Sequence, residues 1–227
     1  MKSFFVTGTD TGVGKTVFTC ALAHLLSSSG IDVGVMKPFA TGISRKGLFQ
    51  SEDAELLVKH SQASDPQNLV NPYFFPIPVS PYMAAKKLGK TIDIDMVLSS
   101  FEKLQSLHDI VLVEGIGGIM TPILRDYFVA DLIKDLNLDA ILVSGTKIGS
   151  VNHTLLTLDL CKKYGIRTAG LVINSVDLNG YDVDDLESDL IALSGINIIC
   201  KIPHISDIET ASKSLQQYDF LSVLAKL

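Results

Sequence analysis

Short apolar runs separated by longer amphipathic stretches form the main pattern of this chain. The runs occupy residues 4–6, 33–36, 110–113, 140–143, 169–173 and 197–200. Runs of this length, with few polar positions, are typical of strands buried on both faces, and most of the intervening stretches have helical spacing. The alternation predicts an α/β fold, a doubly wound, mostly parallel sheet with helices on both faces.

Length and composition favour one domain over residues 1–227, because 227 residues with 47% hydrophobic content can bury one sizeable core. A net charge of -6, without a cluster of Lys and Arg, argues against a nucleic-acid partner. The apolar runs are much shorter than the ~20 residues of a membrane span, and the N-terminal residues leave no room for a signal peptide. We therefore expect a cytoplasmic protein with no membrane partner.

Cysteines and histidines show no metal-ligand spacing in this sequence. Cys20, Cys161 and Cys200 lie far apart within apolar patterns, and His24 falls on an apolar helical face. We expect these side chains to be packing residues, and we assign no structural metal.

The segment from Gly8 to Thr16 reads GTDTGVGKT and follows the phosphate-loop pattern G-x-x-x-x-G-K-[ST]. Glycines let backbone N–H groups approach phosphate oxygens closely. Lys15 supplies positive charge between the β- and γ-phosphates, and the Thr16 hydroxyl can ligate the Mg²⁺ that bridges them. A helical pattern follows, and a helix N-terminus favours anions. The segment predicts a nucleoside triphosphate site but does not indicate which base the nucleotide carries.

Charged residues follow two further apolar runs. Lys37 follows residues 33–36, so its ammonium is expected beside the phosphate loop. Glu114 follows residues 110–113 and precedes a glycine-rich stretch, where a carboxylate can hold Mg²⁺ directly or through water. Asp53 opens the helical pattern SEDAELL, either as a second metal carboxylate or as ordinary compensation of the helix dipole.

Three other segments are candidates for binding. In residues 145–153, GTKIGSVNH, glycines and Ser150 precede a predicted helix over 151–164, whose N-terminus can receive a substrate carboxylate. The alternative is an ordinary glycine-rich turn with Ser150 as the helix cap. Asn174 carries an amide that can read an adenine edge. The proline-rich residues 71–81 predict a surface excursion, either a substrate wall or a plain loop.

Taken together, these motifs resemble the dethiobiotin synthetase family. The resemblance runs in order from residue 3 to about Pro203 and rests on GTDTGVGKT, MKPFATG, SEDA, VNPY at 70–73, LVEGIGG at 112–118, GTKIGSVNH and INS at 173–175. The chain departs from the family at two positions: Gly12 stands where many members carry Glu, and Ser175 where some carry Asp.

This resemblance implies an ATP- and Mg²⁺-dependent ligase that joins 7,8-diaminononanoate with CO₂ or bicarbonate into dethiobiotin, through a carbamate and a carbamic-phosphoric anhydride. Lys15 and Lys37 would be catalytic, and Thr16, Asp53 and Glu114 would hold the metal. The implied ATP-binding residues are Gly12, Val13, Gly14, Lys15, Thr16, Val17, Asp53, Glu114, Gly115, Ile116, Gly117, Asn174, Ser175, Pro203, His204 and Ile205. The implied substrate-binding residues are Thr11, Lys37, Thr41, Ser150, Val151 and Asn152, the last three from the partner subunit of a homodimer.

Two alternatives share the predicted fold. A partitioning or positioning ATPase uses a similar loop, but such proteins usually carry lysine at its second position, where this chain has Thr9. Another ATP-dependent ligase, such as a corrin-ring amidating enzyme, also carries a glutaminase domain, for which this chain has no length left. We therefore expect the synthetase function.

Overall fold

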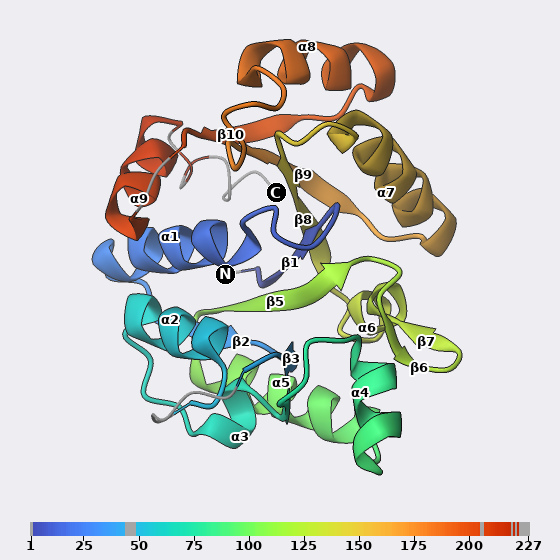
Figure 1. Cartoon of the computed structure of the whole chain (residues 1–227). Helices are drawn as coiled ribbons and strands as arrows, with labels where there is room; N and C mark the ends of the chain where they lie inside the picture. The colour runs from blue at the N-terminus through green and yellow to red at the C-terminus, as the bar shows by residue number, and fades with distance from the viewer. Residues whose placement is uncertain (1, 44–48, 205–206, 219, 221, 223–227) are drawn as a thin grey trace.

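A six-stranded parallel sheet lies at the centre of the computed structural model, which describes residues 2–43, 49–204, 207–218, 220 and 222 (Figure 1). The spatial order of its strands is β10-β9-β8-β1-β5-β2. Each of the six apolar runs forms one strand, which confirms the predicted doubly wound α/β fold. The strands are β1 (Phe4–Gly8), β2 (Val33–Met36), β5 (Ile110–Gly118), β8 (Asp139–Gly145), β9 (Thr168–Asn174) and β10 (Ile198–Ile202).

Successive residues of each strand pack on opposite faces of the sheet, so two cores form. In β1, Phe4 and Val6 belong to one core and Phe5 to the other. The first core is covered by α1 (Lys15–Ser28), α2 (Glu52–Ser61) and α9 (Ile208–Gln217); the second is covered by α5 (Ile94–Leu107), α6 (Val129–Asp135), α7 (Ser150–Tyr164) and α8 (Val183–Ser194).

All three cysteines are buried, as predicted. Within the described ranges, no helix has the length and apolar character needed to cross a bilayer.

Two accessory pairs of strands lie beside the central sheet. β3 (Phe39–Thr41) pairs in parallel with β4 (Tyr73–Phe75), and β6 (Pro122–Leu124) pairs antiparallel with β7 (Tyr127–Phe128). The short helices α3 (Gln67–Val70) and α4 (Pro81–Leu88) flank β4.

The expectation that residues 71–81 form a surface excursion is wrong in part. Asn71 and Phe75 are buried, because β4 pairs with β3 and the Tyr73 ring stacks between Phe39 and Phe75 at centroid distances of 5.4 and 6.1 Å. The prolines flank this strand instead of interrupting it, and Pro81 occupies the first turn of α4, where a missing N–H is tolerated.

The doubly wound topology fixes where a ligand can bind. From β1 the sheet extends through β8 in one direction and through β5 in the other. Helices on the two faces diverge at such a reversal, and the crevice lies beyond the carboxyl ends of the strands. Gly8 and Asn174 are the last residues of β1 and β9, and Lys37 directly follows β2. Glu114 lies within β5, one residue beyond Val113, which pairs with the last residue of β2.

At the opposite edge of the sheet, His108 links three segments of the chain. Its Nδ1 lies 2.8 Å from Oδ1 of Asp32, and its Nε2 lies 2.9 Å from Oδ2 of Asp65. Gly34 makes room for the ring, since a Cβ there would lie 2.5 Å from Cδ2 of His108. Burial opposes the positive charge, but the Asp32 and Asp65 carboxylates outweigh it and raise the pKa of His108. Only the protonated ring donates to both carboxylates.

We expect His108→Gln to destabilise the fold by about 1 kcal/mol at pH 6, after allowance for solvent screening at this partly exposed group. Because the folded-state pKa is raised, the stabilisation is complete below the unfolded pKa of about 6.5 and is lost as pH rises through the folded value. Urea unfolding of both proteins from pH 5.5 to 9 measures the difference, with His24→Gln as a histidine control. A difference that is constant or grows with pH would contradict this account.

Candidate active site

The loop between β1 and α1 has the geometry of an anion cradle. Gly12 and Gly14 adopt positive φ angles of 72° and 89°, which L side chains rarely do. A Cβ at Gly14 would lie 1.7 Å from Nδ2 of Asn174, so no side chain fits there. Gly14 is the N-cap of α1 and has no side chain that could cap the helix. The N–H groups of the first turn therefore remain available to a ligand.

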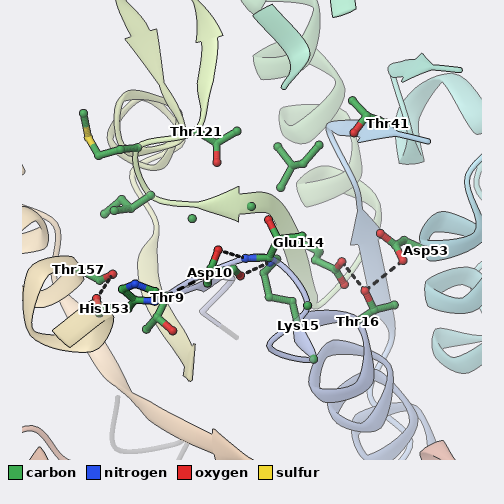
Figure 2. Close-up of a pocket in the computed structure, with 18 of the residues that line it drawn as sticks. Thr9, Asp10, Lys15, Thr16, Thr41, Asp53, Glu114, Thr121, His153 and Thr157 are labelled. Atoms are coloured by element: carbon green, nitrogen blue, oxygen red, sulfur yellow. Dashed lines mark hydrogen bonds and ion pairs between the residues drawn. The ribbon is translucent and has the colours of Figure 1, made fainter. Parts of the chain in front are cut away.

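Lys15 folds back over this loop, as Figure 2 shows. Its Nζ donates to the Asp10 carbonyl at 3.2 Å and would lie 3.0 Å from a Cβ at Gly8. Burial, and secondarily the Lys37 ammonium, lower the pKa of Lys15 to about 8. A bound polyphosphate would offset both effects, so the charged form of Lys15 favours an anion bound next to its ammonium group.

Lys37 lies at the centre of a buried charge cluster. Its Nζ is 2.5 Å from Oε1 of Glu114, 3.0 Å from Oδ2 of Asp53 and 3.0 Å from the Gly115 carbonyl, to which it donates. Burial alone would lower the pKa of Lys37, but the Glu114 and Asp53 carboxylates more than offset this and raise it. Lys37 in turn lowers the pKa of Asp53. The ammonium is therefore charged at the carboxyl edge of the sheet.

Three side-chain oxygens converge around Thr16 (Figure 2). Its Oγ1 lies 2.8 Å from Oε1 of Glu114 and 3.2 Å from Oδ1 of Asp53. Glu114 is fully buried, and its Oε2 has no hydrogen-bond partner among the described residues. An orphaned buried carboxylate oxygen is costly unless a cation or donor reaches it. The set fits a hard, oxygen-liganded cation such as Mg²⁺.

One pocket of about 1160 Å³ lies over this edge of the sheet. Its volume exceeds the roughly 300–1,000 Å³ typical of a site for one drug-sized ligand, so two ligands can lie side by side. One side consists of the phosphate loop with Lys37, Asp53 and Glu114. The opposite wall consists of residues 78–80 and 116–122 and one face of α7.

Most of the predicted site residues line this pocket. Those that do are Thr11, Gly12, Gly14, Lys15, Thr16, Val17, Lys37, Thr41, Asp53, Glu114, Ile116, Gly117, Asn174, Ser175 and His204. Val13 and Gly115 lie behind the wall, and their carbonyls accept from Asn174 and Lys37. Ser150, Val151, Asn152 and Pro203 are not part of the lining. Ile205 lies outside the described residues.

The structure adds lining residues that sequence reasoning missed. On α7, His153, Leu156, Thr157 and Leu160 face the pocket, and Nδ1 of His153 lies 3.6 Å from Oδ2 of Asp10 on the phosphate loop. Their i, i+3, i+4, i+7 spacing is a signal that the sequence contains, since these positions share one helical face. The proline-rich segment also lines the pocket, through residues 78–80.

Comparison with known proteins gives the family. A family model described as an AAA domain matches residues 2–212. A Nitrosopumilus maritimus protein named ATP-dependent dethiobiotin synthetase BioD is 50% identical over 212 residues, which cover 93% of each chain. The chain belongs to the dethiobiotin synthetase family. A Bacillus licheniformis protein of the same name is 40% identical over 208 residues, 91% of this chain and 88% of its own.

The predicted resemblance is thus confirmed, and dethiobiotin synthetases are ATP-dependent ligases of biotin biosynthesis. Solved structures with the same fold include the MinD cell division protein of Aquifex aeolicus, with a TM-score of 0.60, 16% identity and coverage of 100% of this chain and 98% of its own. A ParA family ATPase of Chlorobium tepidum has a TM-score of 0.55 and 19% identity, with coverage of 99% and 95%. At these identities the likeness shows the phosphate-loop NTPase fold alone and gives no support to the switch-ATPase alternative.

Proposed function

We propose that this member of the dethiobiotin synthetase family closes the ureido ring of dethiobiotin from 7,8-diaminononanoate, CO₂ and ATP. One amine adds to the carbon of CO₂ and loses a proton to water, giving a carbamate. A carbamate oxygen then attacks the γ-phosphorus, and ADP leaves. The second amine attacks the carbonyl carbon of this mixed anhydride, the C–O bond to phosphate breaks, and a second proton goes to water.

The observation that carries this proposal is the position of Lys37. Its buried ammonium and the phosphate-binding Lys15 line one pocket, which has room for a second ligand beside the nucleotide. Phosphoryl transfer asks a protein chiefly for positioning and charge stabilisation. Lys15 would hold the β- and γ-phosphates, and Lys37 would stabilise the carbamate oxygens and the transferring phosphoryl group. Thr11 and Thr41, at the pocket wall, would orient the diamine.

The ring-closing step also needs protection from water, because an activated carbamate hydrolyses when exposed. Five apolar side chains line the pocket and would shield a bound alkyl chain from water: Val79, Ile116, Ile119, Leu156 and Leu160. This apolar lining suits the hydrocarbon chain of the diamine.

For the nucleotide base, we propose the end of the pocket beside Asn174, Ser175 and His204, with Pro203 and Ile205 in the same segment. Nδ2 of Asn174 donates to the Val13 carbonyl at 3.1 Å, which uses one of its two amide hydrogens. Nδ1 of His204 lies 3.0 Å from the Ser175 carbonyl and joins the two strand-end segments. If CTP or GTP supported turnover as well as ATP does, the proposal that these residues recognise adenine would be wrong.

Thr16, Asp53 and Glu114 would hold Mg²⁺, since their oxygens converge and Oε2 of Glu114 is buried without a partner among the residues that the structure describes. When bound, the ion would neutralise charge that develops on the β- and γ-phosphates. Across the described ranges, no group of three or more His, Cys, Asp or Glu side chains is arranged for a metal. The mixed hydroxyl and carboxylate set is therefore our candidate.

We expect Glu114→Gln to raise the Mg²⁺ concentration for half-maximal turnover at least about tenfold, because an amide oxygen is a weaker ligand than a carboxylate. A Mg²⁺ titration of turnover measures it, together with the Mg²⁺-dependent thermal stabilisation by ATP. Glu187→Gln is the control, since Glu187 also pairs with a lysine, Lys201, but lies away from the pocket. An unchanged Mg²⁺ requirement in a folded Glu114→Gln protein would exclude Glu114 as a ligand.

The N-terminus of α7 supports a homodimer with shared sites. Ser150, Val151 and Asn152 form the first turn of α7 and do not line this chain's own pocket. Ile148, just before them, is 85% exposed, an apolar side chain that a second copy would cover. We propose that these three residues receive the distal substrate carboxylate of the partner's site. Full activity per subunit in a sample that sedimentation shows to be monomeric would contradict this.

Phosphate release from MgATP tests the proposed function. We expect release that needs both 7,8-diaminononanoate and bicarbonate, with one nucleotide consumed per ring formed. Release that is indifferent to the diamine would leave the nucleotide site in place and refute the proposed ligase reaction.

A further inference from the structure

Asn71, which lies outside the pocket lining, holds the backbone of Lys37 in place. Its Nδ2 donates to the Lys37 carbonyl at 2.6 Å and to the Tyr73 carbonyl at 3.2 Å. The Lys37 N–H donates to the Val70 carbonyl at 2.7 Å. Both polar groups of the Lys37 backbone are therefore bound by residues 70 and 71, which lie more than thirty residues further along the chain.

Lys37 needs this support because the chain leaves the central sheet there. β2 ends at Met36, and β3 begins at Phe39. Pro38 between them has no N–H to donate, and its carbonyl accepts from the Tyr73 N–H at 3.1 Å. The turn that aims Lys37 is thus bound to the segment around β4 instead of to a neighbouring central strand.

The side chain of Asn71 is suited to this task. It is 3% exposed, and its one amide nitrogen carries two hydrogens for two carbonyls. Its Oδ1 is buried and lacks a hydrogen-bond partner among the described residues. A buried unsatisfied oxygen opposes folding, so the benefit of this asparagine lies in its NH₂ group. An ionised aspartate would offer no donor, and glutamine is one methylene longer.

We propose that Asn71 is a positioning residue, which sets the place of the Lys37 ammonium through the Lys37 carbonyl. Nζ of Lys37 has to meet Glu114 at 2.5 Å and Asp53 at 3.0 Å while it faces the pocket. A small shift of the Lys37 backbone moves Nζ away from the reacting oxygens, and catalysis is sensitive to such displacements. This inference rests on the proposed function for its effect on turnover, but the link between Asn71 and Lys37 stands on geometry alone.

A double-mutant cycle tests the inference. We expect Asn71→Ala to lower kcat at least about tenfold with KM for ATP within about threefold, because the phosphate loop is untouched. The double variant Asn71→Ala/Lys37→Ala should be no slower than Lys37→Ala within about twofold, since Asn71 acts only through Lys37. Independent, multiplicative losses would overturn the proposal. Tyr73→Phe is the matched control: it removes the hydrogen bond from the Asp93 N–H to the Tyr73 hydroxyl (2.7 Å) and leaves the Tyr73 carbonyl intact.

A second readout does not depend on activity. In the wild-type protein Lys37 is buried between two carboxylates, so an amine-acylating reagent should label it slowly. Mass spectrometry of the labelled protein should show at least about tenfold faster modification of Lys37 in Asn71→Ala, and unchanged modification of Lys201. Unchanged labelling of Lys37 in a folded variant would refute the link. Asn71→Ser, which removes less volume, is used in the same way if Asn71→Ala does not fold. If wild-type protein forms no dethiobiotin, the proposed function fails while the labelling still decides the role of Asn71.

Discussion

Lys37→Ala is expected to lower kcat about 10²–10³-fold, the loss that follows removal of one group that stabilises charge in a transition state. Affinity for ATP should stay within about fivefold, because the phosphate loop and Lys15 are unchanged. Lys37 contacts Glu114 and Asp53 and faces the part of the pocket that we assign to the carbamate. Steady-state turnover and calorimetric titration with ATP measure the two effects.

The same substitution should also destabilise the fold, by roughly 3–5 kcal/mol, because it leaves the buried Glu114 carboxylate without its cation. Turnover is therefore measured at a temperature where unfolding experiments show the variant to be folded. Lys201→Ala is the control, since Lys201 also bridges two carboxylates, Asp184 and Glu187, on a partly exposed surface. Normal turnover of a folded Lys37→Ala protein would show that the assignment of Lys37 is wrong.

Gly14→Ala is expected to weaken ATP binding at least about 100-fold. A Cβ at this position would lie 1.7 Å from Nδ2 of Asn174, and the backbone φ of 89° is unfavourable for alanine. Relief of the contact has to move either the loop or Asn174, and both line the nucleotide end of the pocket. Titration with ATP monitored by calorimetry measures the loss.

Gly30→Ala is the control for Gly14→Ala, because it introduces similar backbone strain without a steric clash of the new Cβ. Gly30 has a similar φ of 81°, but a Cβ there meets no atom within 4 Å, and it lies after α1, away from the pocket. We expect this control to lose about 1 kcal/mol of stability and to bind ATP normally. Equal ATP affinity of Gly14→Ala and Gly30→Ala would contradict the proposed cradle.

The central part of the site could be predicted from the sequence because strand register brings it together. β2 and β5 pair in parallel with Met36 opposite Val113. Lys37 follows Met36 and Glu114 follows Val113, so the two side chains meet just beyond the end of β2. The phosphate loop is equally local, since its glycine positions follow from backbone conformations within one short segment.

Other parts depend on pairings that the sequence does not signal. β3 and β4 have three residues each and pair although they lie more than thirty residues apart in the sequence. Neither strand has an alternating pattern of apolar and polar residues. This pairing buries Phe75 and brings Asn71 to Lys37, so neither the burial of Phe75 nor the contact between Asn71 and Lys37 was predicted. The proximity of His153 to Asp10 likewise depends on how α7 packs against the phosphate loop.

Product analysis after turnover with ¹³C-bicarbonate, 7,8-diaminononanoate and MgATP decides whether this protein closes the ureido ring. We expect dethiobiotin that carries one labelled carbon, in a 1:1:1 ratio with ADP and inorganic phosphate, because CO₂ supplies the ureido carbon and one phosphoryl transfer activates it. ADP formed at the same rate without the diamine, or a product without the label, would contradict it.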